Sequence, residues 1–218
     1  MKSFSLDAIE MSYYGTIPPV HHDIKQTSRE FAMSNYPLVW VIMGVAGSGK
    51  TLVGRRWAER LDCDFLEGDR RHSPTNILKM KSQIPLEDSD RQQWLLDIKA
   101  DIDQAIRHQR EVVLTCSGLK VSYRRQLTAT GRIQLVWLKV SRAELLRRLS
   151  QRSYHYMKPE MLDSQLETFE ALSPEEDVIT LDGEQSPAQI MDRLDAIALQ
   201  RFPALQKNWW QRLETLNA

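Results

Sequence analysis

Residues 38–51 read LVWVIMGVAGSGKT, an apolar hexapeptide followed by a glycine-rich octapeptide. An unbroken apolar run of this kind is typical of a strand that is buried on both faces of a parallel sheet. The octapeptide fits the pattern G-x-x-x-x-G-K-[ST] in full, and beyond it apolar residues recur at helical spacing as far as Leu61. A strand, a glycine loop and a helix in this order predict a phosphate-binding P-loop.

The residue types of this loop suit a triphosphate. Glycines allow backbone angles that turn successive N–H groups inward as an anion nest, and the following helix adds the positive end of its dipole. Lys50 can reach the β- and γ-phosphates, and the Thr51 hydroxyl can ligate Mg²⁺. The predicted nucleotide-binding residues of the loop are Gly44, Val45, Ala46, Gly47, Ser48, Gly49, Lys50 and Thr51.

The composition excludes little but gives no sign of a membrane or nucleic-acid partner. The chain has 218 residues, which suits one α/β domain, and its 29 Lys+Arg balance its 29 Asp+Glu. Cys63 and Cys116 are far apart and outside any metal spacing, so we expect free thiols in a reducing compartment. We find no long apolar run typical of a membrane span or signal peptide and expect a cytoplasmic protein.

Beyond the P-loop, strands and helices are expected to alternate. Further strands are predicted over 63–66, 111–116, 133–140 and 177–181, and helices over 74–81, 87–108, 119–128, 142–152, 158–169, 187–200 and 204–216. Such alternation indicates an α/β fold of three layers, α/β/α, with a central, mainly parallel five-stranded sheet. Ligands of these sheets bind at the carboxyl ends of the strands.

The acids near the predicted strand ends separate the classes of P-loop protein. A motor ATPase or GTPase usually has a Walker-B Asp after an apolar strand, whereas the strand over 111–116 is followed by Ser117, and no Asn-Lys-x-Asp sequence is present. Asp69 lies just past the second predicted strand. It could accept a proton from a substrate hydroxyl or hold metal-bound water; a solvated acid or a helix cap is the alternative.

Arginines crowd the predicted helix over 142–152. Charge runs on helices are usually solvated, and we expect this of Arg142 and Arg147. Arg148 and Arg152 are four residues apart and share a face. In a small kinase such arginines fold over the phosphates and neutralise charge on the transferred group, so we predict that both contact nucleotide and that Arg152 is catalytic together with Lys50 and Asp69.

Several more stretches match one family. They are Gly68-Asp69 with His72, NILKM at 76–80, IPLEDSDR at 84–91 with Trp94-Leu95, CSGLK at 116–120 with Tyr123-Arg124, and Arg152, His155, Met157, Leu162, Asp163, Ser164, Gln165 and Glu170. On these residues and the P-loop the chain resembles gluconokinase, of the small P-loop type related to shikimate and nucleoside-monophosphate kinases, over about residues 38–195.

The resemblance implies a fold like that of nucleoside-monophosphate (NMP) kinases, with a helical lid, and transfer of the γ-phosphoryl group of ATP, with Mg²⁺, to the 6-hydroxyl of D-gluconate. It implies an acceptor pocket of Asp69, His72, Lys79, Lys120, Arg124, His155 and Gln165. A planar Arg124 can hold a carboxylate bidentately, and Asp and His suit hydroxyls. We expect an N-terminal extension over 1–36 that is partly ordered, a P-loop kinase domain over 37–200, and a helical extension over 201–218 packed on the core or on a partner. A homodimer is expected because the family often forms one.

Some residues keep alternatives open. Arg70 stands where the family usually has an acid, and it could form an outward ion pair or alter the substrate preference. Lys79 and Arg91 could be surface ion-pair partners, and Lys120 a plain surface lysine, whereas Trp94 is expected in the core. The rival functions are a kinase for another small acceptor (another aldonate, shikimate or a nucleotide) and a nucleotide-binding regulatory protein without catalysis.

Overall fold

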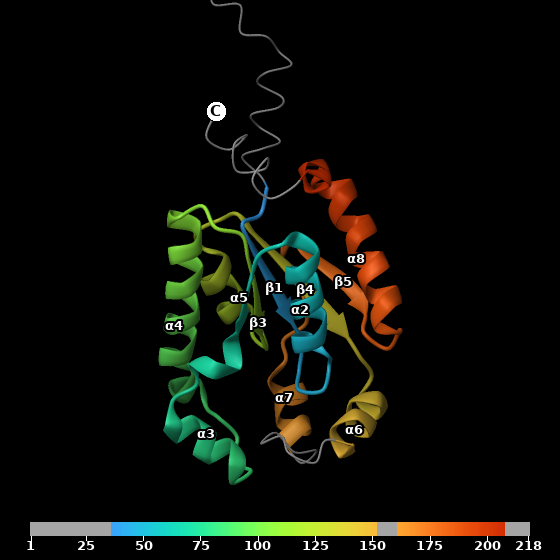
Figure 1. Ribbon diagram of the computed structural model, residues 1–218. Coiled ribbons are helices and arrows are strands. Elements are labelled where there is room, and N and C mark those ends of the chain that lie inside the picture. The colour runs from blue at the N-terminus through green and yellow to red at the C-terminus, as the bar shows by residue number, and fades with distance from the viewer. Residues whose placement is uncertain (1–35, 152–160, 208–218) are drawn as a thin grey trace, which may run out of the picture.

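The computed structural model describes residues 36–151 and 161–207, and these form a three-layer α/β/α fold around one parallel sheet (Figure 1). Every strand pair is parallel, and the strand order is β2-β3-β1-β4-β5. The strands are β1 (Val39–Met43), β2 (Asp64–Glu67), β3 (Val112–Cys116), β4 (Ile133–Lys139) and β5 (Val178–Asp182). The predicted fold class is confirmed, and each predicted strand is present.

Helices cover both faces of the sheet. They are α2 (Lys50–Leu61), α3 (Pro74–Lys81), α4 (Asp88–Arg107), α5 (Val121–Thr128), α6 (Arg142–Ser150), α7 (Leu162–Thr168) and α8 (Pro187–Arg201), with 3₁₀ turns η1 (Gly68–Arg71) and η3 (Pro203–Gln206). Alternate residues of β1 divide the core: Trp40 and Ile42 pack with α2 and α8, whereas Val39 and Val41 pack with α4 and α5. None of the described helices has the length and apolar character needed to cross a membrane.

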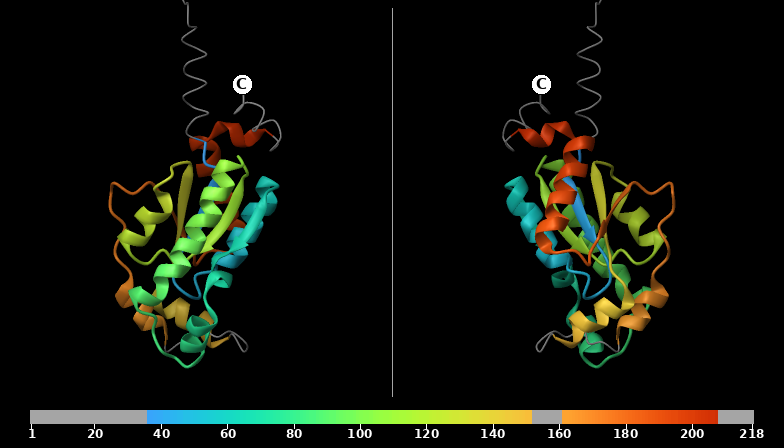
Figure 2. Two further views of the ribbon diagram at one scale, coloured as in Figure 1. Left: turned by 90° about the vertical axis from the view of Figure 1, so that its left-hand side faces the viewer. Right: turned by 90° about the vertical axis from the view of Figure 1, so that its right-hand side faces the viewer.

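A third apolar cluster lies beyond the carboxyl ends of the strands. There α3, α6 and α7 gather at one end of the molecule (Figures 1 and 2), and Met80, Leu145 and Leu162 are buried together with Val45 and Ala46 of the loop after β1. These helices therefore enclose the P-loop, which is where the order of the strands predicts a ligand.

Residues 204–207, the described part of the predicted helix over 204–216, are not α-helical. Helix α8 ends at Arg201, because Pro203 cannot continue an α-helix and restricts the residue before it. The chain then makes η3, and Lys207 has an extended backbone (φ −87°, ψ 155°). Leu205 of this turn is buried in the same cluster as Trp40. The remaining parts of the predicted extensions, 1–35 and 208–218, lie outside the described residues.

Candidate active site

The P-loop joins β1 to α2, and its backbone is open to an anion. Gly44 has φ of 145°, and a Cβ there would lie 2.6 Å from the Ser48 hydroxyl oxygen, so only glycine fits without displacement. Gly49 has φ of 98° and begins α2 without a side-chain cap, and the first turn of α2 holds no acidic residue. The N–H groups and the positive dipole end of this turn are therefore left for a ligand.

One cavity of about 720 Å³ brings the P-loop together with residues from other segments. The predicted site residues that line it are Ala46, Gly47, Ser48, Gly49, Lys50, Thr51, Asp69, His72, Arg148 and Gln165. Gly44, Val45, Lys79, Lys120 and Arg124 do not line the cavity as the described residues form it. Arg152 and His155 lie outside the described residues, so their predicted roles stay predictions.

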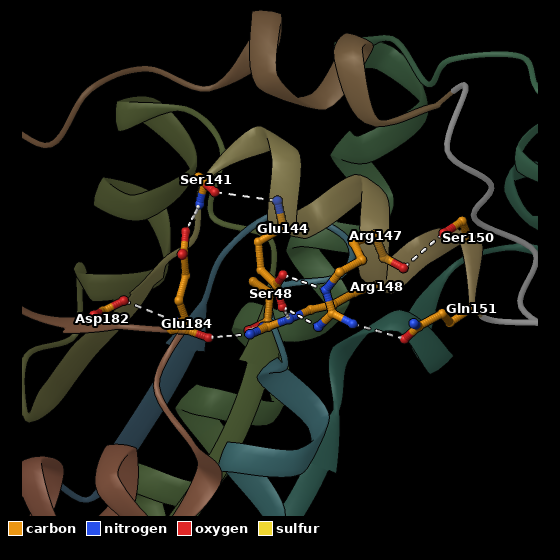
Figure 3. Close-up of polar contacts among 10 residues, drawn as sticks. Ser48, Ser141, Glu144, Arg147, Arg148, Ser150, Gln151, Asp182 and Glu184 are labelled. Atoms are coloured by element: carbon orange, nitrogen blue, oxygen red, sulfur yellow. Dashed lines mark hydrogen bonds and ion pairs between the residues drawn. The ribbon is translucent and has the colours of Figure 1, made fainter.

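The side chain of Arg148 extends from α6 towards the P-loop and the residue after β5 (Figure 3). Its guanidinium donates to the carbonyl of Gly183 at 2.8 Å and lies 3.4 Å from the carbonyl of Ser48, while its Nε donates to Glu144 at 2.7 Å. Hydrogen bonds from Arg147 and Arg148 lower the pKa of Glu144 to about 2. The ion pair orients Arg148 beside the phosphate loop. Arg147 is exposed, as predicted.

Asp69 lies in a turn that is pressed against the sheet. Gly68 donates its N–H to the Thr115 hydroxyl at 3.1 Å, and a Cβ on Gly68 would come within 2.0 Å of the Thr115 carbonyl oxygen. The turn closes where the His72 N–H donates to the Asp69 carbonyl at 3.3 Å. Any larger residue at 68 would push η1 away from β3, so this glycine sets how far Asp69 reaches into the cavity.

His72 presents an imidazole whose Nδ1 has no hydrogen-bond partner within the described part of the chain, although that atom is buried. The ring stacks on Trp94 with centroids 4.5 Å apart and planes 9° apart. Burial lowers the pKa of His72; the charge of Asp69 opposes this shift and that of Arg91 adds to it. A neutral imidazole that lines a cavity is suited to a hydroxyl of a ligand.

Arg91 lines the same cavity, which the sequence did not predict. It comes from the first turn of α4 and is 7% exposed, and it forms an ion pair with Asp88 at 3.9 Å. The sequence alternative of a surface ion-pair partner holds in part, because Arg91 forms an ion pair with Asp88 but its side chain is buried. A signal was present, because Arg91, Trp94 and Ile98 recur at the spacing of the buried face of α4.

Lys79 and Lys120 are bound to carboxylates outside the cavity. Lys79 Nζ lies 2.6 Å from Asp90, and Lys120 Nζ lies 2.6 Å from Asp88. Both acids belong to the first turn of α4, where Asp90 also caps the helix by accepting from the N–H of Glu87. For Lys79 the structure has the ion pair that the sequence left as an alternative.

Arg124 is buried and its guanidinium is fully used. Nε and Nη2 contact both carboxylate oxygens of Glu176, Nη2 also contacts the carbonyl of Ala171, and Nη1 donates to the carbonyls of Gly118 and Leu119. A guanidinium has five N–H donors, and these contacts occupy all of them. In this conformation Arg124 cannot make the predicted bidentate contact with a substrate carboxylate, because it joins the loop after β3 to the segment after α7.

Gln165 connects α7 to the P-loop. Its Oε1 accepts the N–H of Ala46 at 2.7 Å. The far end of α7 is anchored, because Glu170 donates its N–H to the Leu119 carbonyl at 2.8 Å and Phe169 stacks on Trp137. The predicted acceptor residue thus contacts the phosphate loop itself.

Comparison with known proteins agrees with this arrangement. Residues 39–172 match the family model described as AAA domain. A gluconokinase from Gluconobacter oxydans (strain 621H) is 40% identical over 169 residues, which are 77% of this chain and 95% of that protein. The chain belongs to the gluconokinase family of P-loop kinases.

Two solved structures extend the agreement to three dimensions. A sugar kinase from Janibacter sp. HTCC2649 is similar with a TM-score of 0.71 at 37% identity, covering 77% of this chain and 96% of that one. A gluconokinase from Sinorhizobium meliloti 1021 has a TM-score of 0.69 at 36% identity, covering 79% and 97%. The core of this family member, from β1 to α8, is therefore that of a kinase.

Arg70 and the segment after β5 differ in their relation to the cavity. Arg70, the departure from the usual acid, is exposed and does not line the cavity that the described residues form, whereas its neighbour Arg71 makes a bidentate ion pair with Asp101. The segment after β5 also lines the cavity through Gly183, Gln185, Pro187 and Ile190, which sequence reasoning missed. The rule that ligands bind beyond every strand end in such a sheet could have indicated it.

Proposed function

We propose that this chain phosphorylates D-gluconate at its 6-hydroxyl with ATP, giving 6-phosphogluconate. The observation that carries the proposal is one cavity in which P-loop residues 46–51 face Asp69, His72 and Arg91. The relatives named as gluconokinases support the choice of acceptor, since they match this chain over most of their length.

The nucleotide would occupy the end of the cavity formed by the P-loop, α6 and the segment after β5. Lys50 and the first turn of α2 would hold the phosphates. Pro187 and Ile190 offer apolar surface, and Arg148 a planar cation, to a purine base. These groups position the triphosphate and neutralise its charge, which is most of what phosphoryl transfer requires of a protein.

The residues present also fit Mg²⁺. Thr51 and Asp69 line the same cavity, and the described residues contain no group of three or more His, Cys, Asp or Glu that could hold a metal alone. Mg²⁺ is commonly held by one or two protein oxygens together with substrate phosphates and water. Bound there, it would neutralise charge on the phosphates, with the Thr51 hydroxyl as a ligand and Asp69 close to its water.

The acceptor would lie at the other end. Asp69 would align the 6-hydroxyl and accept its proton, and the imidazole of His72, which lines the cavity, would bind a second hydroxyl. Arg91, rather than Arg124, would be the cation that binds the gluconate carboxylate, because Arg91 is buried beside the cavity with only a distant carboxylate contact. Gln165, Arg152 and His155 would complete the site.

We also propose that the chain works in the cytoplasm, as a homodimer, without nucleic acid or membrane. The domain limits of 37–200 for the kinase and 201–218 for a C-terminal extension belong to the proposal, and the packing of Leu205 on the core supports the second.

The test is a coupled assay of ADP release with gluconate, other aldonates, shikimate and nucleoside monophosphates. We expect gluconate to be the preferred acceptor. Asp69→Asn should lower kcat about 10³-fold, which is the loss of rate expected when a general base is removed, while ATP binding persists. Asp192→Asn, at an exposed position on α8, is the matched control.

The outcomes separate the rival functions. Turnover with a different acceptor alone would replace gluconate in the proposal. Tight ATP binding without acceptor-dependent turnover would favour the regulatory protein. Equal activity of Asp69→Asn and Asp192→Asn would remove Asp69 from the chemistry.

A further inference from the structure

Trp94 holds two residues that flank Asp69. It is buried on α4, and its indole Nε1 donates a hydrogen bond to the Gly68 carbonyl at 2.8 Å. Its ring lies flat against His72, with centroids 4.5 Å apart and planes 9° apart. One side chain therefore contacts the residue before Asp69 and the residue three positions after it.

The turn between these two contacts has little freedom. Gly68 is fixed on its other side by the Thr115 hydroxyl at 3.1 Å, and His72 closes the turn through the Asp69 carbonyl at 3.3 Å. With β3 on one side and α4 on the other, η1 can shift only if one of these contacts breaks. The direction of the Asp69 carboxylate depends on both supports.

We propose that Trp94 is a positioning residue of the acceptor site: its N–H sets the depth of Asp69 in the cavity, and its ring face sets the orientation of the His72 imidazole. Trp94 acts through Asp69 and His72, so what it positions them for rests on the proposed function. The sequence indicated a core residue here, and Trp94 fills the core as well.

The other fully buried tryptophans show that burial alone does not require the hydrogen bond. Trp40 and Trp57 are 0% exposed, pack edge to face at 5.1 Å, and have indole N–H groups without a partner in the described residues. Their role is packing in the cluster between the sheet, α2 and α8. The N–H of Trp94 instead meets a backbone carbonyl next to the site, which gives it an energetic consequence when removed.

The stack has a consequence that can be measured at His72. Because the flat indole contributes to the burial that lowers the pKa of His72, removing the ring admits water and raises that pKa. The charged groups that act on the pKa of His72 are Asp69, on its own turn, and Arg91, on α4; neither changes in a Trp94 variant. The titration of His72 therefore reports on the stack without any turnover.

The first experiment compares Trp94→Phe with Trp57→Phe in the full chain. Both variants lose an indole from a packed core, but only Trp94→Phe breaks a hydrogen bond. We expect Trp94→Phe to lower kcat/KM for gluconate about 10-fold, with KM for ATP within about twofold of wild type. Trp57→Phe is expected to retain both constants. Equal kinetics of the two variants per folded molecule would overturn the role of the N–H.

The second experiment follows the imidazole of His72 by NMR in wild type, Trp94→Phe and Trp94→Leu, with His72→Gln for assignment. We expect the pKa of His72 to stay low in Trp94→Phe, which keeps a ring, and to rise towards 6.5 in Trp94→Leu. If Trp94→Leu does not fold, the kinetic comparison of Trp94→Phe with Trp57→Phe still tests the role of the indole N–H. Identical titration in wild type and a folded Trp94→Leu would overturn the stack as a support.

The two experiments fail in different ways. Absence of gluconate turnover in wild type would reject the proposed function but leave the titration intact as a test of Trp94. Gluconate turnover with unchanged kinetics in Trp94→Phe would reject Trp94 and leave the proposed function standing.

Discussion

The two ends of the cavity are built differently. The nucleotide end is mainly backbone from one contiguous loop, in which glycine geometry and the start of α2 leave N–H groups for an anion. The acceptor end consists of side chains from η1, α4 and α7, each fixed by a further contact. Asp69 depends on Gly68, His72 on Trp94, and Gln165 on the N–H of Ala46.

The comparison shows which kind of site can be predicted from a sequence. A site built from the backbone of one loop needs the right residues next to one another, so the sequence motif alone predicts its structure. A side-chain site depends on which partners are near in space. The cations predicted for the acceptor illustrate this, because Lys79, Lys120 and Arg124 each already contact a carboxylate.

Lys50→Met should have the largest effect and act through the nucleotide end alone. We expect kcat to fall about 10³-fold with every acceptor that wild type uses, because the charge that stabilises the transferred phosphoryl group is lost. Steady-state kinetics with gluconate and one slower acceptor would measure it. Lys81→Met, exposed at the end of α3, is the control. A defect confined to KM for gluconate would contradict the division of the cavity.

Arg124→Met should destabilise the fold rather than weaken the acceptor contact. Removing one partner of a buried ion pair leaves Glu176 buried without its partner, so we expect a loss of about 3 kcal/mol in the free energy of unfolding. Chemical denaturation measures it, and the double variant Arg124→Met with Glu176→Leu should recover much of the loss. Unchanged stability with a much higher KM for gluconate would restore Arg124 to the acceptor pocket.

How well each part of the structure can be predicted depends on how far apart in the sequence the contacting residues lie. The P-loop and α2 are predictable because periodicity and glycine spacing act locally, and α2 has its predicted bounds, 50–61. The burial of Arg124 depends on Glu176, 52 residues away, and no local pattern encodes that contact. Asp69 is found from its place just past the second predicted strand and His72 through the family resemblance, whereas Trp94 carries only the signal of a core residue.

Arg91→Gln should weaken the acceptor specifically. We expect KM for gluconate to rise about 30-fold, the size of a lost charge-assisted hydrogen bond, with KM for ATP nearly unchanged. The preference for gluconate over the corresponding alditol, which lacks the carboxylate, should fall by a similar factor. Arg107→Gln, exposed at the end of α4, is the control. An unchanged preference between the two acceptors would mean that another cation holds the carboxylate.

Gln165→Leu should have the smallest effect, and it tests the point where the two ends meet. In the structure Gln165 occupies the N–H of Ala46, a donor that a triphosphate can use. A net hydrogen bond contributes on the order of 1 kcal/mol, so freeing this donor should tighten ATP binding about threefold in calorimetry without gluconate. Gln92→Leu, exposed on α4, should leave it unchanged.

The direction of that small change is informative. Tighter ATP binding in Gln165→Leu means that α7 restrains the phosphate loop until nucleotide displaces its side chain, which then becomes available to the acceptor. Weaker binding would mean that Gln165 supports the loop in its binding conformation, and α7 would then belong to the nucleotide end. A change of either sign means that Gln165 acts on the phosphate loop. A side chain that contacts only the acceptor would leave the affinity for ATP without gluconate unaltered.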